Sequence, residues 1–369
     1  MDKRAYGLDL LRIISMFMVV VFHSLNHGGL VEGALVPGTF NFYACNVLYA
    51  LCLVAVNCFI MISGYFLCTA NYNLKKMIFL WSEAIFYSVL GYVISVASTN
   101  ITFSMTGFIK SFMVLSLKRY WFFTAYLLLY MSIPFLNAAI KQLNKTTHLI
   151  IVCVSLFVFC VLHNIVYTSD FGGINGGSSF LWFCILYVLA AYIRLYVPKK
   201  VRRQTLTLPI YFCACFVVAS ERFLAYVITP MVFGKVTMAS LFFSYNSIFC
   251  VLGTICIFQY FRGIEIKTYW MQKVINIVAP LTFAVYLIHD QSDIRQILWN
   301  YLGLYNYAQS SYLLLKIITI SIGIFVICCF FDKIRKIIVE KSNINKHILL
   351  SCNNIEKWIY SKFQERIHE

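Results

Sequence analysis

Stretches of about 20 apolar residues recur along the whole of this 369-residue chain. A helix rises about 1.5 Å per residue, so a stretch of this length crosses the hydrocarbon core of a bilayer. The pattern predicts an all-α fold, a polytopic transmembrane helical bundle of about ten spans. The expected spans are 8–27, 44–68, 77–98, 121–140, 147–167, 180–197, 207–228, 237–260, 274–292 and 311–331.

The composition indicates one integral membrane domain. Hydrophobic residues make up 61% of the chain and charged residues 12%, whereas soluble domains carry roughly 25% charged residues. We expect the membrane domain to cover 1–333, with no soluble catalytic domain attached. The first span has charges in its first turns and no small-residue cleavage site after it, so we expect it to stay in the mature protein. A basic amphipathic tail at 334–369 suits the anionic inner leaflet, with a plain solvated tail as the alternative.

The net charge of +16 is distributed unevenly between the loops. In a soluble protein this charge would suggest a nucleic-acid partner, but between membrane spans it is a topology signal, because basic loops stay in the cytoplasm. An even number of spans then places both termini in the cytoplasm. The loop at 99–120 fits least well, since it is expected outside and holds Lys110, Lys118 and Arg119. The basic loops contain Lys3 and Arg4, Lys75 and Lys76, Lys141 and Lys145, Lys199 to Arg203, and Arg262, Lys267 and Lys273.

Two familiar chemical motifs are incomplete in this chain. The fourteen cysteines lie mostly within apolar runs and form neither the CxxC pairs nor the Cys/His clusters of metal sites. We interpret them as packing residues, which predicts no disulfide framework and no metal. The segment FGGINGGSSF at 171–180 is rich in glycine, but it lacks the preceding strand and the following lysine of a phosphate loop. A flexible turn is expected there.

The first span carries ionisable residues at Asp9, Arg12, His23 and His27. Such groups are costly inside a membrane and usually face a protein interior or a wet cavity. Arg12 and His23 are in phase on the helix and project from one face about 16 Å apart. Asp9 is one turn from Arg12 and can pair with it. The simpler alternative places Asp9 and Arg12 at the headgroup level, with His23 as a satisfied interfacial histidine.

Polar residues in the other spans suggest two layers when they are ordered by depth. Arg12, Glu83 and Arg194 form the expected inner layer. His23, Glu221 and Arg222 form the outer layer, in which a carboxylate beside the imidazole would fix its tautomer and raise its basicity, as a general base requires. A structural Glu221/Arg222 ion pair is an equal alternative. The remaining polar residues near span ends are His163, His289, Asp290 and Lys316.

The loop before the span at 121–140 could also contribute to a site. Arg119 precedes the aromatic run from Tyr120 to Phe123, which includes Trp121. Arg119 either points into the bundle toward a ligand or extends its guanidinium to the membrane surface.

Four stretches carry a resemblance to a known family. They are the Arg12 to His23 pattern within GLDLLRII and its continuation, FIMISGYFL from Phe59, YWFFTAYLLLYMSIPFLN from Tyr120, and LTFAVYLIHD from Leu281. In this order they resemble the acyltransferase family 3 membrane proteins. The resemblance implies transfer of an acyl group, most often acetyl, from cytoplasmic acyl-CoA to a hydroxyl of an envelope polysaccharide or other surface glycan. The family's essential arginine and histidine map onto Arg12 and His23.

A physical mechanism fits this mapping. Acyl-CoA is anionic, so its phosphates should stay with inner cations such as Arg12, Lys75 or Lys76, while the thin pantetheine arm extends toward His23. His23 would then act as base on the acceptor hydroxyl or first take the acyl group itself. The expected partners are acyl-CoA as co-substrate, a glycan acceptor and the lipid bilayer of a cell membrane, with no other cofactor. The predicted site residues are His23 and Glu221 as catalytic groups and Asp9, Arg12, Lys75, Lys76, Arg119, Trp121 and Arg194 as substrate-binding groups.

Two other classes of function remain open from the residues alone. A secondary transporter or exporter of a glycan or lipid-linked sugar would use the polar layers as a path without making a bond. Transporters of that kind often contain related halves, and no such repeat is recognised in this sequence. A sensor or scaffold would give no reason for a buried histidine in phase with an arginine.

Overall fold

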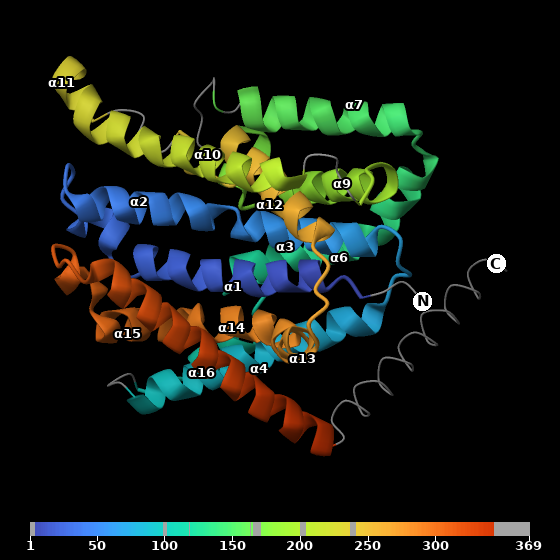
Figure 1. Cartoon of the computed structure of the whole chain (residues 1–369). Coiled ribbons are helices and arrows are strands. Elements are labelled where there is room, and N and C mark those ends of the chain that lie inside the picture. Colours follow the sequence, from blue (N-terminus) through green and yellow to red (C-terminus); the bar gives the residue numbers. More distant parts are fainter. Residues whose placement is uncertain are drawn as a thin grey trace.

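The computed structural model describes residues 4–98, 102–117, 119–162, 164, 171–199, 204–236 and 241–342. Every regular element in these ranges is helical, and the helices run roughly side by side in alternating directions (Figure 1). The expected all-α polytopic bundle is confirmed. Eight helical segments of the described chain are long and apolar enough to cross a membrane, and α9 and α12 are apolar but shorter.

All ten expected spans correspond to helices. They are α1 (Tyr6–Asn26), α2 (Phe40–Leu53) with α3 (Ala55–Leu67), α4 (Leu74–Ser98), α6 (Trp121–Gln142), α7 (Lys145–Leu156) with η2 (Phe157–Leu162), α9 (Phe180–Tyr196), α10 (Gln204–Phe223) with η5 (Leu224–Ile228) and α11 (Thr229–Phe233), α12 (Ile248–Gly263), α13 (Tyr269–Val278) with η6 (Ala279–Leu281) and α14 (Thr282–His289), and α16 (Leu313–Lys341). The connections contain η1 (Leu30–Ala34), α5 (Met105–Phe112), η3 (Phe171–Gly173), η4 (Asn175–Gly177), α15 (Ser292–Leu302) and η7 (Leu304–Tyr307).

Two of these helices differ from the expected bounds. Helix α12 begins at Ile248, because the side chain of Ser247 caps it by accepting the backbone N–H of Cys250 at 3.2 Å. Helix α16 continues to Lys341 and so includes the start of the expected tail, 334–341. The rest of that tail, 343–369, lies outside the described residues, as do Lys118 and His163.

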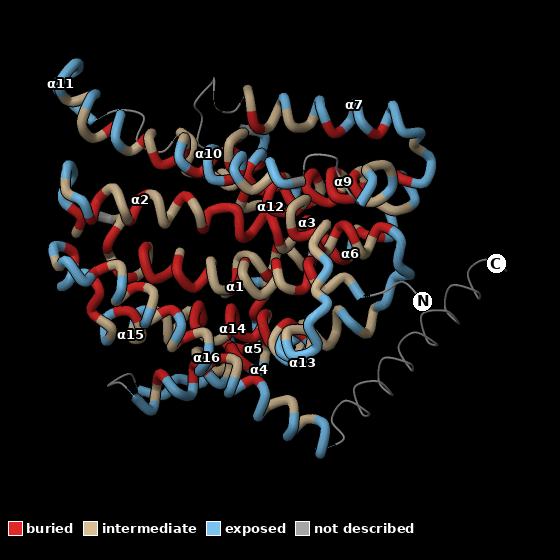
Figure 2. Tube along the Cα trace, viewed as in Figure 1, coloured by how far each residue is buried: buried red, intermediate tan, exposed pale blue. Residues whose placement is uncertain are grey.

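Helix α1 lies in the interior of the bundle. It contacts α2, α3, α12, α14 and α16, and its buried colour contrasts with the exposed faces of α7 and α11 (Figure 2). At Gly7 the approach of α12 is so close that a Cβ atom would collide with the carbonyl oxygen of Phe261. The exposed apolar side chains lie instead on peripheral helices such as α7 and α16, where lipid would cover them.

The basic loops gather at one end of the bundle, where α1 begins and α16 ends (Figure 1). We call this the basic end. Residues from the start of α1, the end of α3, the start of α4, the ends of α9 and α12, and the start of α13 line one cavity there. The alternation of basic and non-basic loops along the sequence therefore corresponds to two ends of one bundle.

Candidate active site

A large cavity of about 1450 Å³ opens at the basic end. We call it the vestibule. Its charged lining is strongly cationic, which favours an anionic ligand such as a phosphate. The cations are Arg4, Arg12, Lys76, Arg194, Lys199, Arg262 and Lys267, and the anions are Asp9 and Glu265.

Asp9 holds two of the arginines at the vestibule wall. Its Oδ1 atom accepts from Nη1 of Arg12 at 2.8 Å, and its Oδ2 atom accepts from Nε of Arg4 at 2.7 Å. The expected pairing of Asp9 with Arg12 is therefore present. The Arg12 side chain remains 31% exposed, so the carboxylate orients the guanidinium while leaving it accessible from the cavity.

The other expected inner cations differ in placement. Arg194 lines the vestibule, donates to the hydroxyl of Tyr65 at 3.2 Å and lies 4.9 Å from the centre of that ring. Lys76 also lines it, whereas Lys75 is not among the lining residues. The backbone N–H of Lys75 donates to the side chain of Asn73 at 3.0 Å, at the start of α4.

A narrow channel of about 210 Å³ continues from the vestibule into the bundle. The two cavities share Arg12, Ser63, Leu80 and Tyr126 as lining residues. Beyond them the channel wall is mostly apolar and aromatic, and it reaches His23. Arg12 lines both cavities and His23 lines the second, and the two residues lie about 16 Å apart along one helix, so the cationic vestibule and the buried imidazole border adjoining cavities.

His23 is hydrogen bonded to a second histidine, which fixes its protonation pattern. Its Nδ1 atom lies 2.9 Å from Nε2 of His289, and Nδ1 of His289 lies 2.5 Å from the carbonyl oxygen of Val285. A carbonyl only accepts, so neutral His289 carries its proton on Nδ1 and accepts at Nε2. His23 must then donate from Nδ1, which leaves the lone pair of a neutral His23 on Nε2.

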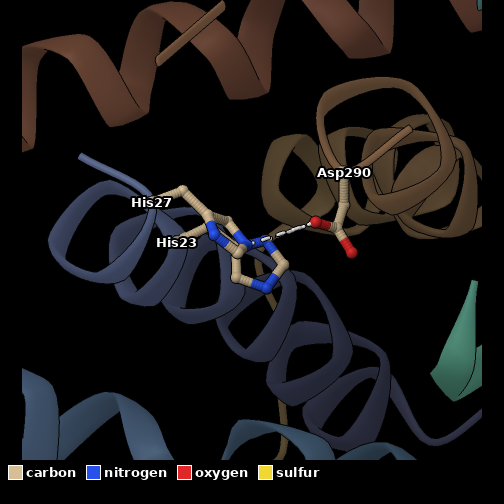
Figure 3. Close-up of side chains that lie close together, drawn as sticks. All are labelled: His23, His27 and Asp290. Atoms are coloured by element: carbon tan, nitrogen blue, oxygen red, sulfur yellow. Dashed lines mark ion pairs between the residues drawn. The ribbon is translucent and has the colours of Figure 1, made fainter. Parts of the chain in front are cut away.

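A buried carboxylate lies beside this histidine pair. Asp290 is 3% exposed, and its Oδ1 atom lies 3.8 Å from Nδ1 of His23, 3.4 Å from Nε2 of His27 and 3.2 Å from Nη1 of Arg295. Figure 3 shows Asp290, directly after α14, facing His23 of α1 and His27, which follows the end of α1. A fixed negative charge at this distance favours the imidazolium that forms when His23 accepts a proton.

His23, His27 and Asp290 also satisfy the spacing of a metal site, since one ligand atom from each lies within 4.8 Å of the others. One donor atom of His23 and one of Asp290 are already engaged, however. Nδ1 of His23 faces His289, and Oδ1 of Asp290 faces Arg295. A guanidinium 3.2 Å from the carboxylate would repel a bound dication. The donor set therefore fits a proton-transfer network better than a metal centre.

Trp121 lines the channel as an aromatic wall residue. Its ring stacks on Tyr245, with centres 5.9 Å apart and planes 24° apart. Tyr245 belongs to the segment 241–247 that precedes α12. The backbone of Tyr245 is held inside the protein, because its N–H donates to Gly176 at 3.0 Å and its carbonyl accepts from Asn57 at 2.7 Å. The segment thus brings irregular backbone to the channel wall with its polar groups satisfied.

The expected pairing of His23 with Glu221 is wrong. The carboxylate beside His23 is Asp290, and within the described chain no hydrogen bond or ion pair joins Glu221 to His23. Glu221 instead accepts the backbone N–H groups of Leu241 and Phe242, the latter at 2.6 Å. These donors need a partner because α12 starts only at Ile248 and leaves them outside a helix. Glu221 therefore anchors the segment 241–247.

Arg119 is also committed to the fold. Its guanidinium makes a bidentate ion pair with Asp293, at 2.9 and 3.1 Å, and donates to Ser88 at 3.0 Å. It lines neither the vestibule nor the channel. Arg119 connects the start of α6 to α15 and α4, so the expectation that it reaches a ligand is wrong.

Two further expectations concern Glu83 and the glycine-rich segment 171–180. Glu83, expected at the depth of Arg12 and Arg194, pairs with Arg335 of α16 at 2.7 Å and lines neither the vestibule nor the channel. The glycine-rich segment 171–180 is packed rather than a free turn. At Gly177 the φ angle is +85°, and a Cβ atom would lie 2.6 Å from Cβ of Tyr245. Only glycine fits there, since the position combines a left-handed backbone with close packing.

Sequence reasoning missed the partners of His23. His289 and Asp290 end the quoted stretch LTFAVYLIHD, so the signal was a His-Asp pair at a span end. His27 is one helical turn from His23 on the same span. Arg295 gave no signal, because it lies in a connecting segment whose packing the spans do not reveal. Tyr245 was expected inside the span 237–260, whereas the structure places it before the start of α12, in the non-helical segment 241–247.

The fold and the site define a polytopic membrane protein in which a cationic vestibule leads through an apolar channel to a buried histidine. The family model of the acyltransferase domain, acyltransferase family 3, matches residues 5–333. The chain belongs to this family and is a membrane acyltransferase. Neither a curated protein nor a solved structure was found to match the chain.

Proposed function

We propose that this protein transfers an acyl group, acetyl in the simplest case, from cytoplasmic acyl-CoA to a hydroxyl of a cell-envelope or exported glycan. The observation that carries the proposal is the continuity of two unlike cavities. The vestibule is wide and cationic, the channel is narrow and apolar, and Arg12 lines both. Acyl-CoA has the same division, with a polyanionic nucleotide at one end and a thin, nearly uncharged arm at the other.

In this proposal, the cations of the vestibule bind the nucleotide end of acyl-CoA, and the narrow channel fits its pantetheine arm. Arg12, held by Asp9, contacts a phosphate together with Lys76 or Arg194. The pantetheine arm fills the channel, where its length brings the thioester toward His23. A charged nucleotide cannot enter the apolar channel without losing its hydration, so the donor has a single orientation.

The reaction proceeds at Nε2 of His23. This nitrogen takes the proton of the acceptor hydroxyl as its oxygen attacks the thioester carbonyl. The carbon–sulfur bond breaks, and the departing CoA thiolate receives the proton from the imidazolium. The same lone pair serves a second route, in which Nε2 itself attacks the thioester and CoA leaves as the thiolate. The acceptor hydroxyl then cleaves the resulting acyl-histidine. Asp290 stabilises the charged imidazole on either route.

The basic end lies in the cytoplasm in this proposal, and the membrane is the bacterial cytoplasmic membrane. Basic residues at that end include Lys76, Lys199 and Lys267, and each favours the cytoplasmic surface by about 1 kcal/mol. The donor therefore enters from the cytoplasm, and the acyl group travels outward through the channel to an acceptor at the opposite end.

Purified protein with radiolabelled acetyl-CoA tests the proposal. We expect release of free CoA, with the label passing to water, to an added glycan or to the protein, and we expect none of these with His23→Ala. Wild-type protein that neither binds nor cleaves acetyl-CoA would favour a transport function. Comparison of envelope glycans from strains with and without the protein would identify the acceptor through the missing acetyl signal.

A further inference from the structure

A third cavity, of about 230 Å³, lies at the end of the bundle opposite the vestibule. It sits between η1, the start of α2 and the junction of α10 with η5. Most of its lining is apolar or neutral, and Arg222 is its one charged residue within the described side chains. Its other lining residues are Val31, Gly33, Leu35, Phe42, Asn46 and Tyr226.

Arg222 has few partners for a guanidinium inside a span. Its Nη1 atom donates weakly to the hydroxyl of Tyr226 at 3.4 Å, and its Nε atom is buried without a hydrogen-bond partner. No described carboxylate lies within ion-pair distance, since the adjacent Glu221 is bonded to the backbone of 241–247. The expected Glu221/Arg222 ion pair is therefore not formed. A cation in a span requires compensation from a wet cavity or a bound anion.

Aromatic rings contact the guanidinium of Arg222, which also lines the cavity. Its central carbon lies 4.6 Å from the ring centre of Phe243 and 5.7 Å from that of Tyr226. Stacking of this kind fixes the plane of an arginine while its donors remain in a fork that matches a carboxylate or a phosphate. Asn46 and Tyr226 add neutral polar groups to the same cavity.

A row of three aromatic rings, Phe243, Tyr49 and Phe22, connects Arg222 to the wall of the His23 channel. Phe243, which stacks with Arg222, packs on Tyr49 with ring centres 5.3 Å apart. Tyr49 packs on Phe22 at 4.4 Å, and Phe22 lines the channel next to His23. A glycan bound beside Arg222 would thus lie on the acceptor side of the reaction centre.

We infer that the Arg222 cavity is an oxyanion subsite for the acceptor, and that the acceptor carries a carboxylate or a phosphate. The inference rests on the proposed function, because it assigns the cavity to the acceptor of that reaction. Arg222, the one charged group among the described lining side chains, suits a single carboxylate or phosphate group, and the cavity's small volume admits the group itself but only part of the sugar.

Binding of small anions by the full-length protein in lipid nanodiscs tests this inference without any catalytic step. The probes are glucuronic acid, glucose 1-phosphate and uncharged glucose, and the readout is the midpoint of thermal unfolding. At a tenfold excess over the dissociation constant, we expect an anionic sugar to raise the midpoint by about 2–4 °C, with no rise for glucose. A response to glucuronic acid alone indicates a carboxylate, and a response to glucose 1-phosphate alone indicates a phosphate.

Arg222→Gln should abolish the anion response, and Arg222→Lys should keep part of it because the charge remains while the fork is lost. Lys235→Gln is the matched control, since Lys235 is an exposed cation near the same end that does not line the cavity. The inference is overturned if glucose gives the same shift, if neither anion gives one, or if Arg222→Gln responds as wild type does. Acetyl-CoA cleavage without an anion response would reject this subsite alone, whereas an anion response without thioester chemistry would reject the proposed function.

Discussion

Nδ1 of His23 lies 2.9 Å from Nε2 of His289, and this contact joins the first span to a helix more than 250 residues later in the chain. Because Nδ1 of His289 is used by the carbonyl of Val285, the pair has one consistent arrangement of protons when both rings are neutral. The result is an imidazole whose basic nitrogen is Nε2. Under the proposed function, the contact prepares His23 as a base or nucleophile before any substrate arrives.

His23→Ala is expected to lower acyl transfer by roughly 10²–10⁴-fold, because the reaction loses its only positioned base. Binding of CoA should remain measurable, since the phosphates contact the vestibule and not His23. Radiolabelled acetyl transfer and equilibrium binding of CoA check the two parts. Near-normal turnover, at normal expression in membranes, would show that His23 is not the reacting group.

His289→Phe removes the acceptor for the Nδ1 proton of His23, whereas His289→Gln can still present an oxygen there. We expect kcat to fall roughly tenfold or more for the phenylalanine variant, with KM for acetyl-CoA little changed, and a partial recovery for the glutamine variant. Steady-state kinetics of both variants make the comparison. Equal losses in the two variants would indicate that His289 only fills space.

Arg12→Ala is expected to weaken donor binding by about 1.5–3 kcal/mol, the range for a lost hydrogen bond to a charged group. The effect should appear in the dissociation constant for CoA and should shrink for pantetheine, which has no nucleotide. Lys141→Ala is the matched control, because Lys141 is a basic-end cation outside the vestibule lining. Similar losses in both variants would mean that general positive charge, and not Arg12, binds the donor.

Glu221→Gln is expected to destabilise the protein by about 1–3 kcal/mol, because the backbone N–H groups of Leu241 and Phe242 lose a charged acceptor. The pH dependence of kcat should follow that of the wild type, since Glu221 anchors the segment 241–247 and does not pair with His23. Thermal unfolding and a pH–rate profile measure the two effects. A displaced pH profile with unchanged stability would indicate that Glu221 takes part in catalysis.

The orientation of the bundle can be checked with an impermeant thiol reagent in a background without native cysteines. Lys235→Cys, at the end opposite the vestibule, should be labelled in intact cells, and Lys267→Cys, in the vestibule, should be labelled only after lysis. Labelling of position 267 in intact cells would reverse the orientation and exclude a cytoplasmic donor in the vestibule.

Much of the fold was predictable because helix formation in a membrane depends on local sequence. Each span must satisfy its own backbone hydrogen bonds, so the apolar stretches gave the number and approximate limits of the helices. The errors occurred where side chains change the local rule. Because Ser247 caps α12, this helix begins later than expected. Helix α16 extends beyond its apolar part, where Arg335 forms an ion pair with Glu83.

The sequence by itself determined the relative position of Arg12 and His23. Both residues lie on one helix, and the helical period fixes their separation and their common face. It also placed Asp9 within reach of Arg12. Only the tertiary structure decided which carboxylate stands beside His23. Glu221 and Asp290 are both acidic residues toward the same end of the bundle, but depth along a helix does not specify its rotation or its neighbours. Packing turns Glu221 toward the backbone of 241–247 and brings His289 and Asp290 against α1.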